Sequence, residues 1–319
     1  MPVTRCIPDL ISYNSAVKAA GGKGGQWQLA MLLLETVQVQ SLRPDKITFS
    51  GAISSCEHGG QWELALHLLG AMTSSSIRPD EINCNAGITA CEKSGQWQVA
   101  LALLSKMPEI RLVPNHISLS ASISACEKGG QWQLALVLLG HIPLRRLTLN
   151  EISFSATISA CEKGGQWQQS LFLLAQMPGV RIEPNEFSYS AAISACEKCQ
   201  QWQLALALLD NMHEAEVLPN CFSYNAAISA CSNSDQWEGA LWLLGEMPVM
   251  RFMPSDISYN AAIHACEGGC QWELSLLLLA DMVLLRLSPD RISCNAAVSA
   301  CERRAARWPW TTRDTGRAV

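Results

Sequence analysis

A tryptophan preceded by glutamine recurs every 35 residues along this chain, and that period constrains the fold more than any other feature. The ladder consists of Trp27, Trp62, Trp97, Trp132, Trp167, Trp202, Trp237 and Trp272. A chain of 319 residues would ordinarily form about two globular domains. An internal repeat of this length instead predicts units that stack on their neighbours, because one such unit cannot bury its apolar side chains alone.

The tryptophans set the phase of eight repeats and the start of a ninth. The repeats are 10–45, 46–80, 81–115, 116–150, 151–185, 186–220, 221–255 and 256–290, and the partial one is 291–303. Residues 10–303 are therefore expected to form a single solenoid, between a lead-in (1–9) and an irregular tail (304–319). Because the ninth repeat is incomplete, the sequence is also compatible with a fragment of a longer array.

Each repeat is expected to contain two helices. In repeat 116–150, residues 116–128 (HISLSASISACEK) alternate apolar and polar positions, which would also fit a strand. A thirteen-residue strand would be long, however, and half of this segment is Ser, Ala, Glu or Lys. Gly129 and Gly130 break this first helix, and Pro143 is expected to end a second one over 131–142. The Asn or Asp that closes most repeats is well placed to cap the next first helix.

One position of the repeat holds a cysteine eight times. The ladder consists of Cys56, Cys91, Cys126, Cys161, Cys196, Cys231, Cys266 and Cys301. A residue tied to one structural position is most simply a small buried hydrophobic group. The cysteines are thus interpreted as reduced core thiols in a reducing compartment rather than as a disulfide framework.

Several residues together resemble the pentatricopeptide repeat. The segment 184–212, PNEFSYSAAISACEKCQQWQLALALLDNM, carries the closing Pro-Asn and the helix-two Ala-Leu typical of that family, and Tyr-Asn pairs begin at Tyr13, Tyr224 and Tyr259. The resemblance covers about residues 10–303 and implies an all-α fold, a right-handed α-solenoid superhelix of 35-residue helix-turn-helix repeats. The tetratricopeptide repeat, with a period of about 34, is the nearest alternative.

The resemblance also implies a ligand, single-stranded RNA, with about one base bound per repeat. In the family the fifth and last residues of each repeat read the base; here these pairs are Asn14/Asp45, Ser50/Asp80, Asn85/Asn115, Ser120/Asn150, Ser155/Asn185, Ser190/Asn220, Asn225/Ser255 and Asn260/Asp290. The apolar second residues, which sandwich bases in the family, are Ile11, Ile47, Ile82, Ile117, Ile152, Phe187, Phe222 and Ile257.

The variation of these pairs fits a reading role. The fifth position alternates between Asn and Ser and the last among Asp, Asn and Ser, which differ in donors and acceptors. The family's pairing rules then imply the target 5′-UG(C/U)AAACU-3′. Hydrogen bonding within the helix is the alternative role for Asn and Ser at position five, although it does not account for paired variation.

Lysines follow the Cys-Glu pair at Lys93, Lys128, Lys163 and Lys198, a position near the RNA backbone in the family. The alternative is a solvated helix end, where a cation is favoured by the helix dipole. The formal charge of the chain is −5, so charge distribution has to supply any attraction to phosphate. Four or five phosphate contacts predict a salt slope of only about −3.

Signs of catalysis or of a bound cofactor are not found in this sequence. The pair Cys196 and Cys199 is a lone C-x-x-C, whereas a zinc site needs about four ligands. Residues 304–319 carry neither part of the zinc deaminase signature found in some relatives. We expect no enzyme, metal, cofactor or small-molecule substrate, and no membrane span, because no apolar run reaches 18 residues. The tryptophans are expected in the core or between repeats rather than stacked on bases.

Two further expectations rest on the family or on the repeat architecture. Family members act in RNA processing, stability or translation in mitochondria or chloroplasts, although residues 1–9 show no transit-peptide composition. The competing function is a protein–protein interaction scaffold like a tetratricopeptide array, which the acidic charge favours and which leaves protein partners open.

Overall fold

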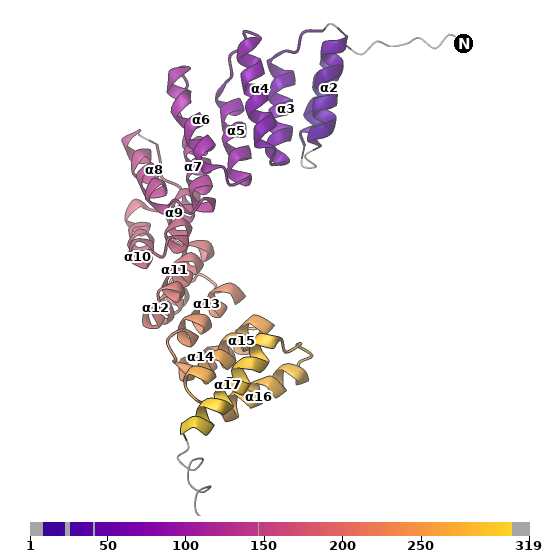
Figure 1. Cartoon of the computed structure of the whole chain (residues 1–319). Helices are drawn as coiled ribbons and strands as arrows, with labels where there is room; N and C mark the ends of the chain where they lie inside the picture. Colours follow the sequence, from indigo (N-terminus) through magenta and orange to yellow (C-terminus); the bar gives the residue numbers. More distant parts are fainter. Residues whose placement is uncertain (1–8, 23–25, 41, 146, 308–319) are drawn as a thin grey trace, which may run out of the picture. The chain divides into compact units, whose positions relative to one another are not determined.

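The computed structural model describes residues 9–22, 26–40, 42–145 and 147–307, and these residues form paired helices with no strand among them (Figure 1). The helices are α1 (Leu10–Ala20), α2 (Trp27–Val39), α3 (Lys46–His58), α4 (Trp62–Ser74), α5 (Glu81–Lys93), α6 (Trp97–Glu109), α7 (His116–Lys128), α8 (Trp132–Leu144), α9 (Glu151–Lys163), α10 (Trp167–Gln176), α11 (Glu186–Lys198), α12 (Trp202–Glu214), α13 (Cys221–Ser232), α14 (Trp237–Val249), α15 (Asp256–Gly268), α16 (Trp272–Leu284) and α17 (Arg291–Arg307). Each repeat thus contributes the two helices that its sequence predicts.

The chain divides into two compact halves, residues 1–164 and 165–319. Within each half the first helices of successive repeats pack against one another, as α1, α3, α5, α7 and α9 do in the N-terminal half. Within a half, a second helix contacts its own first helix and the first helix of the next repeat, so that α4 lies between α3 and α5 (Figure 1). Nearest-neighbour packing of this kind is an all-α solenoid, which confirms the fold class.

First helices are buried almost all round. In α7 the residues from Ser118 to Ala125 are buried or half-buried, because the helix packs against first helices on two sides and second helices on a third. Small residues suit this environment, since they let neighbouring backbones approach closely. Its second residue, Ile117, remains outside this packing and is exposed.

Second helices run slightly further than the sequence indicates. The prolines Pro108, Pro143 and Pro248 are the last residue but one of α6, α8 and α14. The expectation that proline ends the helix is therefore wrong here, and the helix predicted over 131–142 ends two residues later, at Leu144. Proline in the last turn removes a single backbone hydrogen bond, and the helix tolerates this loss. Near the C-terminus, α17 continues to Arg307, four residues past residue 303, where the partial ninth repeat is predicted to end. Residues 1–8 and 308–319 lie outside the described part.

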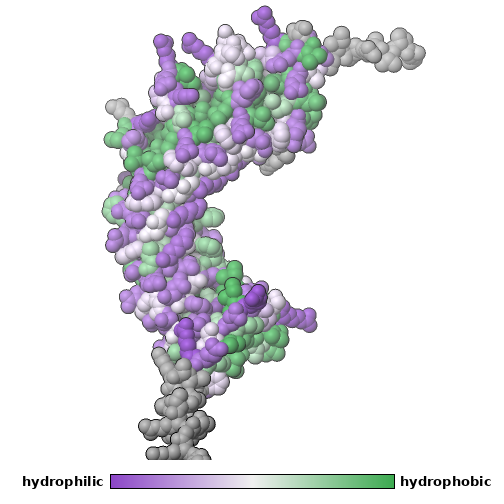
Figure 2. Space-filling view, viewed as in Figure 1, coloured by the Kyte–Doolittle hydropathy of each residue, from purple (hydrophilic) through white to green (hydrophobic). Residues whose placement is uncertain are grey.

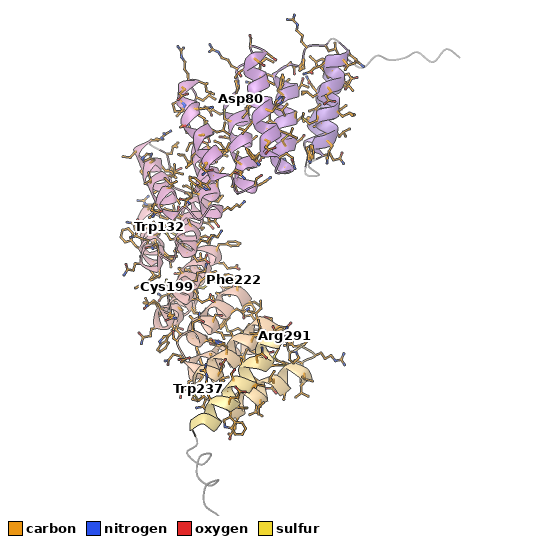
Figure 3. All side chains as sticks on the ribbon, in the orientation of Figure 1. Asp80, Trp132, Cys199, Phe222, Trp237 and Arg291 are labelled. Carbon is orange, nitrogen blue, oxygen red and sulfur yellow. The ribbon has the colours of Figure 1, made fainter. Side chains whose placement is uncertain are left out.

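The tryptophans pack between repeats. Gly59, Gly129, Gly164 and Gly269 follow first helices, and the indole of the preceding repeat's tryptophan lies against each of them. A Cβ atom added to Gly129 would lie 2.2 Å from Cδ1 of Trp97, well inside van der Waals contact. The following residue, Gly130, has φ +67°, a left-handed conformation that glycine adopts without strain. This inter-repeat role agrees with the prediction for the ladder, of which Figure 3 labels Trp132 and Trp237.

The cysteine ladder lies in the core. Its first seven members are fully buried, and Cys301 is half-buried. Burial raises the pKa of each of these seven thiols to about 11, so they stay protonated and unreactive at neutral pH. All the described cysteines are free, as expected for reduced core residues. None of the described helices combines the length and apolar character needed to cross a membrane.

The tryptophan–glycine contact predicts opposite effects for two alanine substitutions. Gly129→Ala forces a methyl group into the Trp97 ring and should lower the free energy of unfolding by about 1–3 kcal/mol. Gly140→Ala is the control, because Gly140 lies in α8 with open space around its missing Cβ, and it should raise stability by about 0.5–1 kcal/mol. Urea unfolding followed by circular dichroism measures both; equal effects of the two substitutions would show that the contact is unimportant.

Candidate nucleic-acid interface

The last residue of every repeat is the N-cap of the next first helix. These caps are Asp45, Asp80, Asn115, Asn150, Asn185, Asn220, Ser255 and Asp290. A side-chain oxygen of the cap accepts a backbone N–H three residues on; for Asn150 the distance to Ser153 N is 2.9 Å. Such a bond satisfies one of the unpaired donors at a helix start, which explains why only short oxygen-bearing residues close the repeats. The predicted capping role is confirmed.

The fifth residues lie one turn into the first helices, and three of the four asparagines among them donate to the cap. Asn14 Nδ2 lies 3.0 Å from Asp45 Oδ2, and Asn260 Nδ2 lies 3.1 Å from Asp290 Oδ2. Asn85 Nδ2 donates to Asn115 Oδ1 at 3.3 Å. The structure therefore joins three of the sequence-derived pairs directly by hydrogen bonds.

The serines at position five are too short to reach the cap. Among the described residues, the hydroxyl oxygens of Ser120, Ser155 and Ser190 are buried and have no hydrogen-bond partner. A buried hydroxyl without a partner costs free energy, so the Asn/Ser alternation at position five does not come from hydrogen bonding within the fold at these three repeats. Ser50 differs, because its hydroxyl donates to the Lys46 carbonyl oxygen at 2.7 Å, the local bonding that the alternative role describes.

The second residues form the apolar part of the interface. All eight project from the first turn of a first helix and are 47–73% exposed, between the values for Ile117 and Ile11. Figure 3 labels Phe222, which stands at the start of α13. Bulky apolar side chains that are this exposed, at the same position of every repeat, form surface suited to contact flat apolar groups.

The first residue of some repeats binds the cap that closes the same repeat. Lys46 Nζ forms an ion pair of 2.7 Å with Asp80 Oδ2, and Glu186 accepts a hydrogen bond from Asn220 Nδ2. The two caps thus differ in the atom that the first residue engages, a carboxylate oxygen in Asp80 and the amide nitrogen in Asn220. Figure 3 shows Asp80 at the start of α5, between its own repeat and the next.

The aspartate caps are held ionised. Burial alone would raise the pKa of Asp45, but hydrogen bonds from Thr48 and Asn14 outweigh it and lower that pKa below its ordinary value. For Asp290 the backbone N–H of Ser293 is the main cause of a lowered pKa. At neutral pH these caps are therefore carboxylates that accept hydrogen bonds and cannot donate them.

The four lysines are the last residues of α5, α7, α9 and α11, where a cation is favoured by the helix dipole. Two of them also pair with a glutamate one repeat earlier: Lys128 Nζ lies 3.1 Å from Glu92 Oε1, and Lys163 Nζ lies 2.9 Å from Glu127 Oε1. These two lysines thus link neighbouring repeats through ion pairs. Because the glutamate carboxylate offsets part of the lysine's positive charge, the attraction of each lysine for a polyanion is weakened.

Metal-binding groups do not assemble in the part of the chain that the structure covers. No group of three or more His, Cys, Asp or Glu side chains is placed there to hold an ion. Cys196 is buried in the core, while the Cys199 thiol donates to the Gly165 carbonyl oxygen at 3.3 Å. Cys196 therefore serves packing, and Cys199 forms a hydrogen bond to the preceding repeat.

One position of the interface escapes sequence reasoning, the third residue of each repeat. Thr48 Oγ1 donates to Oδ1 of Asn14 at 2.6 Å, and Ser258 Oγ donates to Oδ1 of Asn225 at 2.6 Å, each to the fifth residue of the repeat before it. The sequence shows a hydroxyl three residues after every one of these caps except Asp80, which Asn83 follows, and this is the capping-box pattern. That pattern explains the hydroxyl but does not reveal its second contact.

Family models match two parts of the chain. The models described as "PPR repeat family" and "PPR repeat" match residues 184–233 and 222–252, and the one described as "Pentatricopeptide repeat domain" matches residues 67–128. All three matches fall within the 35-residue register set by the tryptophans. The matched segments of this chain are pentatricopeptide repeats.

Solved structures of pentatricopeptide repeat proteins share this fold. PPR10 from maize is 19% identical with a TM-score of 0.58, over 92% of this chain and 47% of PPR10. PPR10 in complex with an 18-nt psaJ RNA element is 16% identical (TM-score 0.53), with 94% and 54% covered. The PPR domain of Arabidopsis thaliana protein-only RNase P 1, in complex with tRNA, is 14% identical (TM-score 0.51), with 58% and 97% covered. This chain spans about half the length of PPR10. No curated protein matches it.

Alanine substitutions should separate reading residues from structural ones. Ser120→Ala removes a buried hydroxyl without a partner, so stability should stay unchanged or rise by up to about 1 kcal/mol. Asn150→Ala removes a cap from α9 and should lower stability by about 1 kcal/mol.

Thermal unfolding of the two variants, with Ser50→Ala as the locally bonded control, provides the measurement. A loss of stability in Ser120→Ala as large as in Asn150→Ala would mean that position five serves the fold alone.

Proposed function

We propose that this chain binds single-stranded RNA, with one base per repeat read by the fifth residue and the cap that closes the repeat. The observation that carries the proposal is the direct hydrogen bond between these two side chains in repeats 1, 3 and 8, next to an exposed apolar second residue. A polar pair beside an apolar side chain matches the chemistry of a base, which has a hydrogen-bonding edge and two apolar faces.

The chemical differences between the pairs support discrimination between bases. Ionised aspartate caps only accept hydrogen bonds, whereas asparagine caps also donate. The unpartnered hydroxyls of Ser120, Ser155 and Ser190 retain their capacity to donate and accept. Neighbouring core positions hardly vary from repeat to repeat, so these pairs are where one repeat differs from the next.

In chain order, the eight pairs correspond to 5′-UG(C/U)AAACU-3′ under the family's pairing rules. The PPR10 complex holds a psaJ RNA element and the RNase P domain complex holds tRNA, which supports RNA as the ligand class. The role we propose is organellar, in processing, stability or translation of a transcript in mitochondria or chloroplasts. The described chain would act by binding, with no cofactor and no catalytic step of its own.

A protein–protein interaction scaffold is the second candidate function. Second helices expose large apolar side chains, among them Phe172, Trp242 and Leu277 at 57–60%, and apolar groups reach the surface in both halves (Figure 2). Exposed apolar side chains of this size are common at protein interfaces. They lie on other helices than the reading pairs, so protein partners are compatible with RNA binding.

A gel-shift assay tests the proposed function. The chain should retain 5′-UGCAAACU-3′ at least about tenfold more tightly than a shuffled octamer of the same composition, because each mismatched base costs about 1–3 kcal/mol in comparable readers. Equal affinity for the two octamers would refute base readout. No retention of a random single-stranded RNA pool at low salt would favour the protein scaffold instead.

A further inference from the structure

The asparagines at position five differ in how their side-chain amides are held. An amide has an oxygen that accepts and a nitrogen that donates, and rotating it by half a turn exchanges the two. Which end faces the ligand therefore depends on the neighbouring hydrogen bonds. In this chain the decisive neighbour comes from the next repeat.

In repeat 1 the amide of Asn14 is fixed at both ends. Its Nδ2 donates to the Asp45 carboxylate at 3.0 and 3.2 Å, and its Oδ1 accepts from the Thr48 hydroxyl at 2.6 Å. A half-turn of the amide would place its oxygen against a carboxylate. The orientation is thus set by two contacts of opposite polarity.

In repeat 7 a hydroxyl performs the same task without help from a carboxylate. Ser258 Oγ lies 2.6 Å from Asn225 Oδ1 and 3.2 Å from the hydroxyl of the cap, Ser255. The Ser258 proton is directed to Asn225 Oδ1, which is closer than the Ser255 hydroxyl, and Ser258 also accepts a hydrogen bond from the backbone N–H of Ser255 at 3.0 Å. The cap and the fifth residue are thereby linked through Ser258.

Repeats 3 and 8 lack this contact. The hydroxyls of Ser118 and Ser293 donate to the backbone carbonyl oxygens of their own caps, at 2.8 and 3.0 Å. Correspondingly, Asn85 Oδ1 and Asn260 Oδ1 are buried without a hydrogen-bond partner among the described residues. The four asparagine repeats therefore fall into two classes, with the amide oxygen held in repeats 1 and 7 and unheld in repeats 3 and 8.

We infer that the third residue of the following repeat, Thr48 after repeat 1 and Ser258 after repeat 7, is a positioning residue that orients the fifth-position amide and sharpens selection of the base. With its oxygen held by the hydroxyl, the amide presents N–H donors, which suit the carbonyl oxygens on a pyrimidine edge. Without the hydroxyl the amide turns more freely and accepts other edges. This inference rests on the proposed function.

The two classes also make the repeats unequal readers. Discrimination against purines should be sharpest at base 1, where a carboxylate and a hydroxyl both hold the amide, and weakest at base 3, where neither does. Repeats 1 and 8 share the pair Asn and Asp, so a difference between bases 1 and 8 would originate outside the reading pairs.

The test measures base selectivity of the full chain with octamers that carry each of the four bases at position 7. Ser258→Ala should reduce the preference for pyrimidine at base 7 by about three- to tenfold, the effect of one net hydrogen bond. Selectivity at base 4 should not change. Ser258→Thr keeps the hydroxyl, as Thr48 does naturally, and should restore the preference at base 7.

Ser153→Ala is the matched control. Its hydroxyl belongs to the same kind of capping box and lies 2.6 Å from Asn150 Oδ1 and 2.9 Å from the Asn150 carbonyl oxygen, but the preceding fifth residue is Ser120, which has no side-chain carbonyl. The control should lose cap stability while keeping selectivity at base 4.

Three results would overturn the inference. Full selectivity at base 7 in Ser258→Ala would show that the hydroxyl does not orient the amide. Equal loss of selectivity in Ser258→Ala and Ser153→Ala would indicate a general effect on folding. Absence of any base preference in the unsubstituted chain would refute the proposed function itself, and this is distinguishable because it appears before any substitution is made.

Discussion

The cap at the start of each first helix is the interaction on which both the stacking and the proposed reading site depend. Its side chain satisfies backbone N–H groups of the next repeat, so it must be short and must carry an oxygen. The capped helix packs against the first helix before it, which brings the cap to the fifth residue of the previous repeat. A residue needed for folding is thus placed where a ligand can meet it.

This double use explains the chemistry available to each repeat. One oxygen of the cap is committed to the helix, as Asn150 Oδ1 is to Ser153, and the remaining polar atom is free to vary. Other side chains then compete for that atom: Lys46 pairs with Asp80, and Asn14 donates to Asp45. Fifth residues face no such demand from the fold, and three serines remain buried without a partner there.

The fold was largely predictable from the sequence, because a 35-residue period fixes the helices, the turns and the equivalence of positions. It correctly predicts the capping residues, the tryptophans between repeats and the buried cysteines. It does not reveal that Lys128 and Lys163 pair with glutamates, or that Thr48 and Ser258 contact asparagines. These contacts join residues 33 to 36 positions apart, and their geometry depends on how closely neighbouring helices pack. The helix predicted over 131–142 runs two residues further, to Leu144, because a helix tolerates proline in its last turn.

The central claim is that one side chain at position five selects the base while the rest of the repeat serves as a scaffold. Exchanging Ser120 for asparagine tests it most directly, because the resulting Asn/Asn pair would match that of repeat 3 in the same chain. The preferred base at position 4 of the octamer should change from A to a pyrimidine, with the preferences at the other seven positions unchanged. An unaltered preference for A, or an equal fall in affinity for all four bases, would contradict this account.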